Sequence, residues 1–312
     1  MAITAKQVKE LRELTGSGMM DCKKALTETD GDMDKAVEWL REKGKASAEK
    51  KASRIAAEGL VMVKVAEDGK KGVAVEVNSE TDFVAKNELF REFVSEVADQ
   101  AMDSSAADMD AFLAEPWKLD ASKTVKDIQT EKVAVIGENL NIRRFETVEA
   151  ADGVVVDYTH MGGKIGVLVQ VKSDVVNDAI VEMGKNVAMQ IAAMRPKYTS
   201  RSEVPADYIE KEEQILLAAI MNDPKESQKP EKVIKGIVKG RVNKEMKEIV
   251  LLDQVYVKAE DGKQTVAKYV EEVGKANGAK TSVVGFLRYE TGEGLEKKNE
   301  DFAAEVAAQM NK

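Results

Sequence analysis

The 312-residue sequence predicts an α+β fold. Apolar residues recur at helical spacing near the N-terminus and then alternate as they do in strands. One strand–turn–strand–helix pattern occurs twice, and two long amphipathic helices interrupt its second copy. We expect five parts, in this order: a three-helix domain with a linker (1–55), a first core subdomain (56–146), a second core subdomain (147–196 and 250–290), an inserted helical hairpin (197–249) and a C-terminal module with a helix (291–312).

The composition excludes several classes of protein. A third of the residues are charged, the net charge is −9, and aromatic residues make up only 5%. These values suit a soluble, helix-rich protein and argue against a nucleic-acid partner, which would require a basic surface. Cys22 is the only cysteine, so an internal disulfide framework and a thiolate metal cluster are excluded. A secretory pattern and a bilayer-spanning apolar run are both absent from the sequence, so we expect a cytoplasmic protein with no membrane partner.

The N-terminal part predicts three short helices. Thr4 and Gln7 form a capping box at the start of the first helix. The third helix is expected to end just before Gly44. A basic, alanine-rich stretch, Lys43–Arg54, then predicts a helical linker.

Two adjacent methionines, Met19 and Met20, stand in the second of these helices. A domain this small cannot bury both on opposite sides of one helix, so at least one is expected to face solvent as an adaptable docking surface. The alternative is that both line the thin core of the domain or its contact with the next domain.

No metal site or catalytic centre is predicted. The spacing of Asp30, Asp32 and Asp34 is similar to a calcium-binding loop, but Lys35 and Arg41 stand where that loop needs a glycine and a glutamate. Capping and turn formation explain these aspartates better. The sequence contains a single histidine, so a histidine-rich metal site is excluded and a catalytic triad would have to be built on that residue. We therefore expect neither an enzyme nor a bound cofactor.

The core begins with two alternating strands, Leu60–Val65 and Gly72–Val77, around a tight turn. Asn87 then caps a helix with one apolar face. The same order returns later, with strands at Val154–Val156 and Ile165–Val171 and a helix over residues 178–194. Two pairs of segments match in sequence: Gly72–Val77 with Gly166–Val171, and Val97–Gln100 with Val187–Gln190. This repetition predicts two related subdomains, each a small antiparallel sheet with a helix.

The segment Thr81-Asp82-Phe83-Val84 follows the second of the first pair of strands. It places an acid beside a large aromatic where a buried strand ends, which is where proteins often display functional residues. A purely structural interpretation has Thr81 or Asp82 capping a turn and Phe83 buried in the core. The second copy has Asp174–Asn177 at this place, without an acid beside an aromatic, which favours a special role for the first copy.

A helical hairpin is predicted between Pro196 and Leu252, with Pro224 and Pro230 on either side of its loop. Each helix carries one apolar stripe: Tyr208, Ile209, Ile215, Leu216, Ala219 and Ile220 in the first, and Ile234, Val238, Val242 and Met246 in the second. Two such helices leave apolar surface uncovered. One interpretation is that the hairpin folds back on the core of the same chain.

Five blocks together resemble the bacterial elongation factor Ts family, and they run in the family's order over almost the whole chain: Leu11–Leu26, Val75–Val84, Ile136–Arg144, Ile165–Val169 and Gly285–Lys297. The resemblance implies a ubiquitin-associated-like N-terminal domain and a duplicated core. It also implies a function, guanine nucleotide exchange on elongation factor Tu during translation elongation. The partner would be bound in its GDP-bound and nucleotide-free forms.

The resemblance assigns roles to residues of this sequence. Arg12, Met19, Met20 and Lys23 would dock on the GTP-binding domain of the partner. Thr81–Val84 would form a loop that disturbs the partner's Mg²⁺ and phosphate site.

Within that loop, the resemblance makes Phe83 a wedge between helices of the partner and places Asp82 near the shell of its Mg²⁺. His160 would press on another helix, although an extra residue near Met161 departs from the family pattern. The hairpin would mediate self-association or reach the partner, and a tail helix, Phe302–Met310, would touch it.

Two other functions are kept as alternatives. A nucleotide-insensitive adaptor would use the N-terminal domain and the hairpin to join proteins, and it predicts that Phe83 is buried. An RNA-binding protein would show a steep salt dependence, which the acidic composition argues against.

Overall fold

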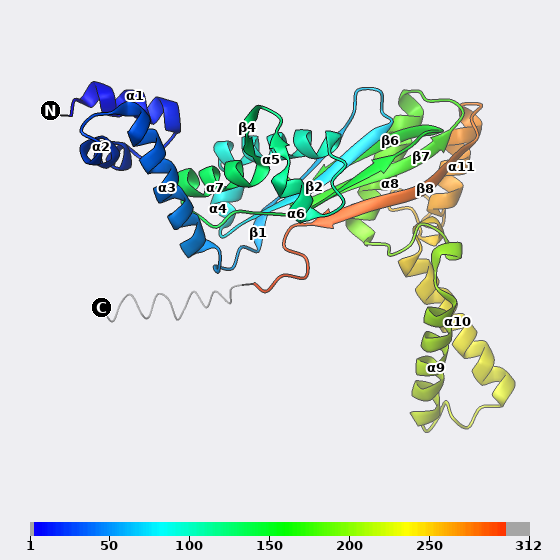
Figure 1. The fold of residues 1–312 in the computed structure, drawn as a ribbon. Helices are drawn as coiled ribbons and strands as arrows, with labels where there is room; N and C mark the ends of the chain where they lie inside the picture. Colours follow the sequence, from blue (N-terminus) through cyan, green and yellow to red (C-terminus); the bar gives the residue numbers. More distant parts are fainter. Residues whose placement is uncertain (1–2, 298–312) are drawn as a thin grey trace.

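The computed structural model describes residues 3–297. A helical domain lies at one end of the molecule, a core of sheets and helices in the middle, and a two-helix arm projects from the far end (Figure 1). The α+β prediction is confirmed. Within residues 3–297 no helix is long and apolar enough to cross a membrane. The predicted tail helix at residues 302–310 lies outside the described residues, and the predicted domain boundaries stay predictions.

The N-terminal domain consists of α1 (Ala5–Thr15), α2 (Met19–Glu28) and α3 (Met33–Lys51). Its predicted capping box is present: Gln7 N–H donates to Thr4 Oγ1 at 3.3 Å, and Thr4 N–H donates to Gln7 Oε1 at 3.0 Å. The three helices share a small core of Val8, Leu11, Cys22, Ala25, Leu26, Ala36 and Leu40.

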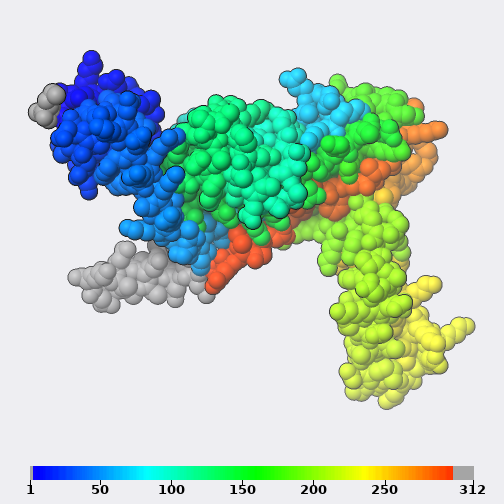
Figure 2. All heavy atoms as spheres, in the orientation of Figure 1, coloured from blue at the N-terminus to red at the C-terminus, as the bar shows by residue number. Residues whose placement is uncertain are grey.

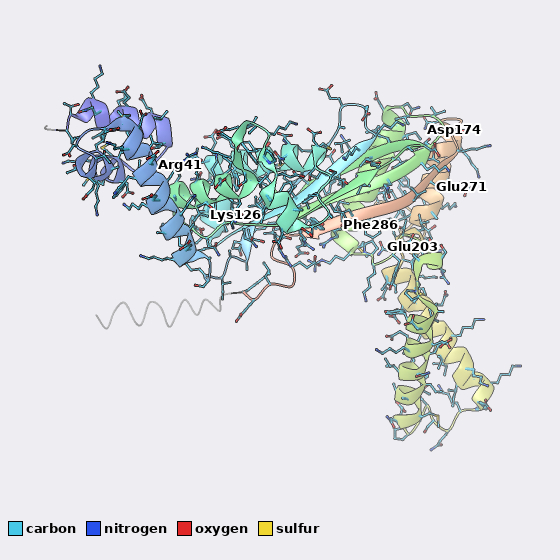
Figure 3. All side chains as sticks on the ribbon, viewed as in Figure 1. Arg41, Lys126, Asp174, Glu203, Glu271 and Phe286 are labelled. Atoms are coloured by element: carbon cyan, nitrogen blue, oxygen red, sulfur yellow. The ribbon has the colours of Figure 1, made fainter. Side chains whose placement is uncertain are left out.

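The prediction that the third helix ends before Gly44 was wrong. Helix α3 continues through Gly44, which is buried where α3 meets α7 (Val125–Ile136). A Cβ atom at this position would lie 3.1 Å from the Cβ of Ala134, so the glycine permits close helix packing and does not end the helix. Arg41 of α3 (Figure 3) adds an ion pair to Glu131 of α7 at 3.5 Å.

The first half of the core is an antiparallel sheet in the order β1-β2-β5, from β1 (Glu58–Val65), β2 (Lys71–Ser79) and β5 (Asn141–Glu149). Helix α5 (Glu88–Asp103) covers one face, and its predicted apolar residues Phe90, Phe93, Val94, Val97 and Ala101 are all buried. The sequence did not predict the short elements between them: α4 (Asp82–Ala85), α6 (Met109–Ala114), β3 (Pro116–Trp117) and β4 (Asp120–Thr124).

The second half repeats this plan with the sheet order β6-β7-β8. Its strands are β6 (Gly153–His160), β7 (Ile165–Ser173) and β8 (Thr281–Glu290), and α8 (Asp178–Met194) and α11 (Val266–Ala276) cover the outer face. The predicted strands and the helix over residues 178–194 are confirmed; α11 was not predicted.

The duplication extends to individual hydrogen bonds. Gln100 of α5 donates to the carbonyl of Pro116 at 3.3 Å and accepts from the N–H of Lys118 at 2.8 Å. Its counterpart Gln190 of α8 makes the same two bonds to segment 255–257, at 3.1 and 2.8 Å. In both halves one glutamine side chain therefore pairs with a backbone N–H and a backbone carbonyl of a connecting segment. That segment has no long strand beside it that could pair with these groups.

The two sheets pack on each other through a shared apolar layer of Val61, Val63, Ala74, Val148, Ala150, Val155, Leu168 and Tyr289. Two equivalent glycines allow the close approach. A Cβ atom at Gly72 would lie 2.8 Å from Val155 Cγ1, and one at Gly166 would lie 2.5 Å from Val61 Cγ1. Both distances are shorter than carbon atoms tolerate, so a side chain at either position would push the sheets apart.

A buried carboxylate on β2 adds a polar link. Glu76 is fully buried; its oxygens accept from Arg143 Nη1 at 3.0 and 3.2 Å, from Arg144 Nε at 2.6 Å and from the N–H of Gly292 at 2.8 Å. Arg144 also stacks over the ring of Tyr289 at 4.0 Å. These contacts hold the segment after β8 against the first sheet.

The arm consists of α9 (Ala206–Asn222) and α10 (Glu231–Ile249), and Pro230 directly precedes α10. The predicted stripe of α10 is buried against α9, and Tyr208, Ile209, Leu216 and Ile220 of α9 face it wholly or in part. Ile215 and Ala219 of the predicted α9 stripe are exposed, so the two helices leave apolar surface uncovered, as expected. The arm stands away from the core (Figure 2).

Alanine at Gly166 is expected to lower the free energy of unfolding by about 1–3 kcal/mol, because it overpacks the contact between the sheets. The matched control is Gly240→Ala in α10, where a Cβ atom would meet nothing within 4 Å. There the same change should raise stability by about 0.5–1 kcal/mol. Urea unfolding followed by circular dichroism measures both. Equal effects at the two positions would contradict the close packing of the sheets.

Candidate functional site

The segment Thr81–Val84 leaves the buried end of β2 and forms the single turn α4. Thr81 caps it, with its Oγ1 accepting from the N–H of Val84 at 3.3 Å, as the structural interpretation expected. The same interpretation was wrong about Phe83, whose side chain is 80% exposed. The loop therefore holds a large aromatic ring in solvent, which is favourable only when a partner covers it.

Asp82 lies beside this ring and is ionised at neutral pH. Lys86 donates to Asp82 Oδ2 at 2.6 Å, and its Nζ lies 5.9 Å from the centre of the Phe83 ring. The hydrogen bond from Lys86, together with the positive charges of Lys86 and Lys164, holds the pKa of Asp82 below its usual value. The loop thus presents an apolar ring and a carboxylate side by side.

Glu138, just after α7, supports the loop from beneath. Its Oε2 accepts from the N–H groups of Glu80 and Thr81, both at 3.0 Å, and its Oε1 accepts from the hydroxyl of Thr81 at 2.7 Å. Sequence reasoning missed this residue. The signal that could have found it was the block Ile136–Arg144, which contributed to the family resemblance but received no role.

His160 ends β6 at the tip of the β6–β7 hairpin, and its Nδ1 lies 3.0 Å from the hydroxyl of Tyr158. The neighbouring Met161 is 71% exposed. This hairpin lies at the same end of the core as the Phe83 loop, because Arg91 of α5 donates to Gly162 O at 3.3 Å. The charge of Lys164, from the same hairpin, also acts on Asp82.

The four predicted docking residues of the N-terminal domain, Arg12, Met19, Met20 and Lys23, are all exposed. Met19 is 59% and Met20 74% exposed, so the alternative that both line the domain core was wrong. Leu14, 67% exposed, is a further apolar residue that sequence reasoning missed. Exposed apolar side chains on so small a domain are typical of a binding surface.

Metal binding finds no support in the described part of the chain. Asp32 caps α3, accepting from the N–H of Lys35 at 3.1 Å, as predicted. Within residues 3–297 no group of three or more His, Cys, Asp and Glu side chains could hold a metal ion.

A groove of about 320 Å³ lies between β5 and β8 at the base of the arm. Its lining includes Glu203 and Phe286 (Figure 3) and the edges of both strands. None of the predicted site residues lines it. The candidate site is therefore a set of exposed side chains and not a cavity.

Comparison with known proteins identifies the chain. The family described as Elongation factor TS matches residues 80–293, which begin at the Phe83 loop. Elongation factor Ts of Clostridium novyi (strain NT) is 50% identical over 309 residues, covering 99% of both chains. The chain belongs to the elongation factor Ts family. Elongation factor Ts of Halothermothrix orenii is also 50% identical, over the full length of both chains.

Membership of the elongation factor Ts family confirms the predicted resemblance and makes the chain a translation elongation factor. The roles assigned to the individual residues of the loop, the hairpin tip and the N-terminal domain stay predictions. The geometry shows that each of these side chains is accessible or partly accessible to a partner.

Proposed function

We propose that the chain is a guanine nucleotide exchange factor that binds elongation factor Tu in the cytoplasm and promotes GDP release. Family membership supports the partner, and the 80% exposure of Phe83 supports the mechanism. A partner that prefers the nucleotide-free GTPase must weaken nucleotide binding, and the nucleotide must weaken the partner's binding by the same factor. Exchange is then mutual displacement and needs no catalytic group on this chain.

The Thr81–Val84 loop is the part that we propose to act on the nucleotide site. Burying a phenylalanine ring gains about 1.5–3 kcal/mol, so Phe83 favours whichever partner conformation opens a pocket for it. In a GTPase, Mg²⁺ bridges the phosphate oxygens of the nucleotide. The ionised Asp82 would compete for groups that order this ion and its water.

The other exposed residues would hold the complex together. Arg12, Met19, Met20 and Lys23 would dock on the GTP-binding domain, and His160 would add a contact next to the Phe83 loop. Methionine suits such a surface because its flexible side chain adapts to the partner.

The arm is the part that we propose for self-association. Leu217 and Met221, one turn apart on α9, are 43% and 54% exposed, and Val233 of α10 is 46% exposed. Apolar area of this kind favours a second copy of the chain over solvent.

A nucleotide-insensitive adaptor is the second hypothesis. It predicts a buried Phe83, whereas Phe83 is exposed. It also predicts equal affinity for elongation factor Tu with and without GDP.

Phe83→Ala is expected to reduce the acceleration of GDP release by about tenfold or more at saturating concentration. Alanine lacks the aromatic ring, so the free energy gained by burying that ring in the partner's open pocket is lost. The release rate of a fluorescent GDP from purified elongation factor Tu measures this. Leu119→Ala, which removes another exposed apolar side chain of the same subdomain, should leave the rate unchanged. Failure of the wild-type chain to accelerate release would refute the exchange function.

Met19→Ser with Met20→Ser is expected to raise the concentration needed for half-maximal exchange by about tenfold and to leave the limiting rate unchanged. The methionines contribute docking energy and do not touch the nucleotide site in this proposal. Lys9→Ser on α1, which changes an exposed side chain on a neighbouring helix, is the control. A lower limiting rate with unchanged affinity would contradict the docking role.

Leu217→Asp with Met221→Asp is expected to leave the 34.2 kDa chain monomeric at concentrations where the wild type dimerises, as sedimentation velocity would show. Gln214→Asp adds one negative charge at a polar, exposed position of α9 and should not disturb the dimer. A wild-type chain that stays monomeric throughout would exclude self-association through the arm.

A further inference from the structure

We propose that Glu138 is a positioning residue: its carboxylate holds the loop that carries Phe83 in the orientation needed to act on the partner. The inference rests on the proposed exchange function.

Two chain segments are locked together beneath Phe83. Three hydrogen bonds run from Glu80 and Thr81 to the carboxylate of Glu138, at 2.7 to 3.0 Å. One runs the other way, from the N–H of Asn139 to Glu80 Oε1 at 2.7 Å. Charge-assisted hydrogen bonds of this kind are short and directional, so they fix the backbone at residues 80 and 81.

The same cluster holds the chain that arrives from the N-terminal domain. Asn139 Nδ2 donates to the carbonyl of Arg54 at 2.9 Å, and Arg54 pairs with Glu80 at 3.4 Å. The two surfaces that we propose to face the partner, on the N-terminal domain and on the Phe83 loop, are therefore anchored at one point.

Helix α4 cannot hold Phe83 in place by itself: Val84 and Ala85 pack against the first core, and the bonds to Glu138 hold the residues before its N-terminus. It is a single turn of four residues, and an isolated helix of this length does not form in water. Its N-terminus is capped by Thr81, the residue that also donates to Glu138. A change in the Glu138 carboxylate is thus transmitted to the cap of α4 and to the ring two residues further along the chain.

The second half of the core provides an internal comparison. From the strand registers, Glu80 corresponds to Asp174, Asn139 to Lys280, and Glu138 to Ala279. The N–H of Lys280 donates to Asp174 Oδ1 at 2.7 Å, so the bond from Asn139 to Glu80 has a structural equivalent.

The support beneath the loop has no such equivalent. Ala279 has no side-chain acceptor, Val175 stands in place of Thr81, and residues 174–177 form no helix. The carboxylate, the capping threonine and the exposed aromatic thus occur together, and only in the half that carries the wedge. The bond from Asn139 to Glu80, by contrast, belongs to the scaffold that both halves share.

The test combines Glu138→Ala and Glu138→Gln with Phe83→Ala in a double-mutant cycle, measured as release of fluorescent GDP from elongation factor Tu. Glu138→Ala is expected to lower the limiting rate by about tenfold or more, with less than about a threefold change in the half-saturating concentration. In the Phe83→Ala background the same substitution should change the rate less than about twofold, because Glu138 acts through the ring. Glu138→Gln, which keeps one acceptor oxygen, should lie between wild type and alanine.

Asp174→Ala is the control, since it removes the counterpart of the Asn139–Glu80 bond from the half without a wedge (Asp174 in Figure 3), and this variant should promote GDP release at the wild-type rate. Hydrogen exchange of the amides of Glu80 and Thr81 gives a readout that does not depend on the partner: both should exchange faster in Glu138→Ala.

Three results would overturn the inference: an unchanged limiting rate in Glu138→Ala, an equal loss with and without Phe83, or unchanged exchange of the two amides. Wild-type chain that does not accelerate GDP release would instead refute the proposed function, and the functional half of the inference with it. Faster amide exchange in that case would still establish the link between Glu138 and the loop.

Discussion

The close contact between the two three-stranded sheets is the constraint on which the rest of the molecule depends. It buries one face of each sheet and leaves the other face for α5 in the first half and for α8 and α11 in the second. It also brings the β6–β7 hairpin to the Phe83 loop, because the N–H of Val61 donates to Gly163 O at 2.7 Å. The Phe83 loop and the tip of the β6–β7 hairpin thus owe their proximity to apolar packing behind them.

The ion cluster around Glu76 adds specificity to this packing. A fully buried carboxylate is costly unless it is paired and hydrogen-bonded, and here two arginines and a backbone N–H meet it. Its counterpart in the second half is the neutral Gln170, which donates to the carbonyl of Glu149 at 2.7 Å. The charged version occurs where the chain after β8 must be held, so its role is to select one position for that segment.

The two halves show how a duplicated scaffold carries some features in both copies and others in one. Hydrogen bonds shared by the two halves include those of Gln100 and Gln190. The exposed aromatic and its support, Phe83 and Glu138, occur once. Both halves of the core keep the same scaffold of sheet and helix, and the first half carries an exposed aromatic ring in addition. Exposing this ring to water costs free energy, which burial of the sheets and helices behind it offsets.

The sequence by itself determined the elements whose pattern is local. Strands β1, β2, β6 and β7 and helices α5 and α8 follow from periodicity, and the caps at Thr4, Asn87 and Asp32 follow from side chains that bond within three residues. The blocks in family order also identified the family. Only the tertiary structure decided that Gly44 lies inside a helix, that Phe83 is exposed, and that Glu138 supports its loop across 57 positions. These three features depend on contacts between residues far apart in the chain. Local periodicity does not show which distant residues pack against a given side chain or whether that side chain stays exposed.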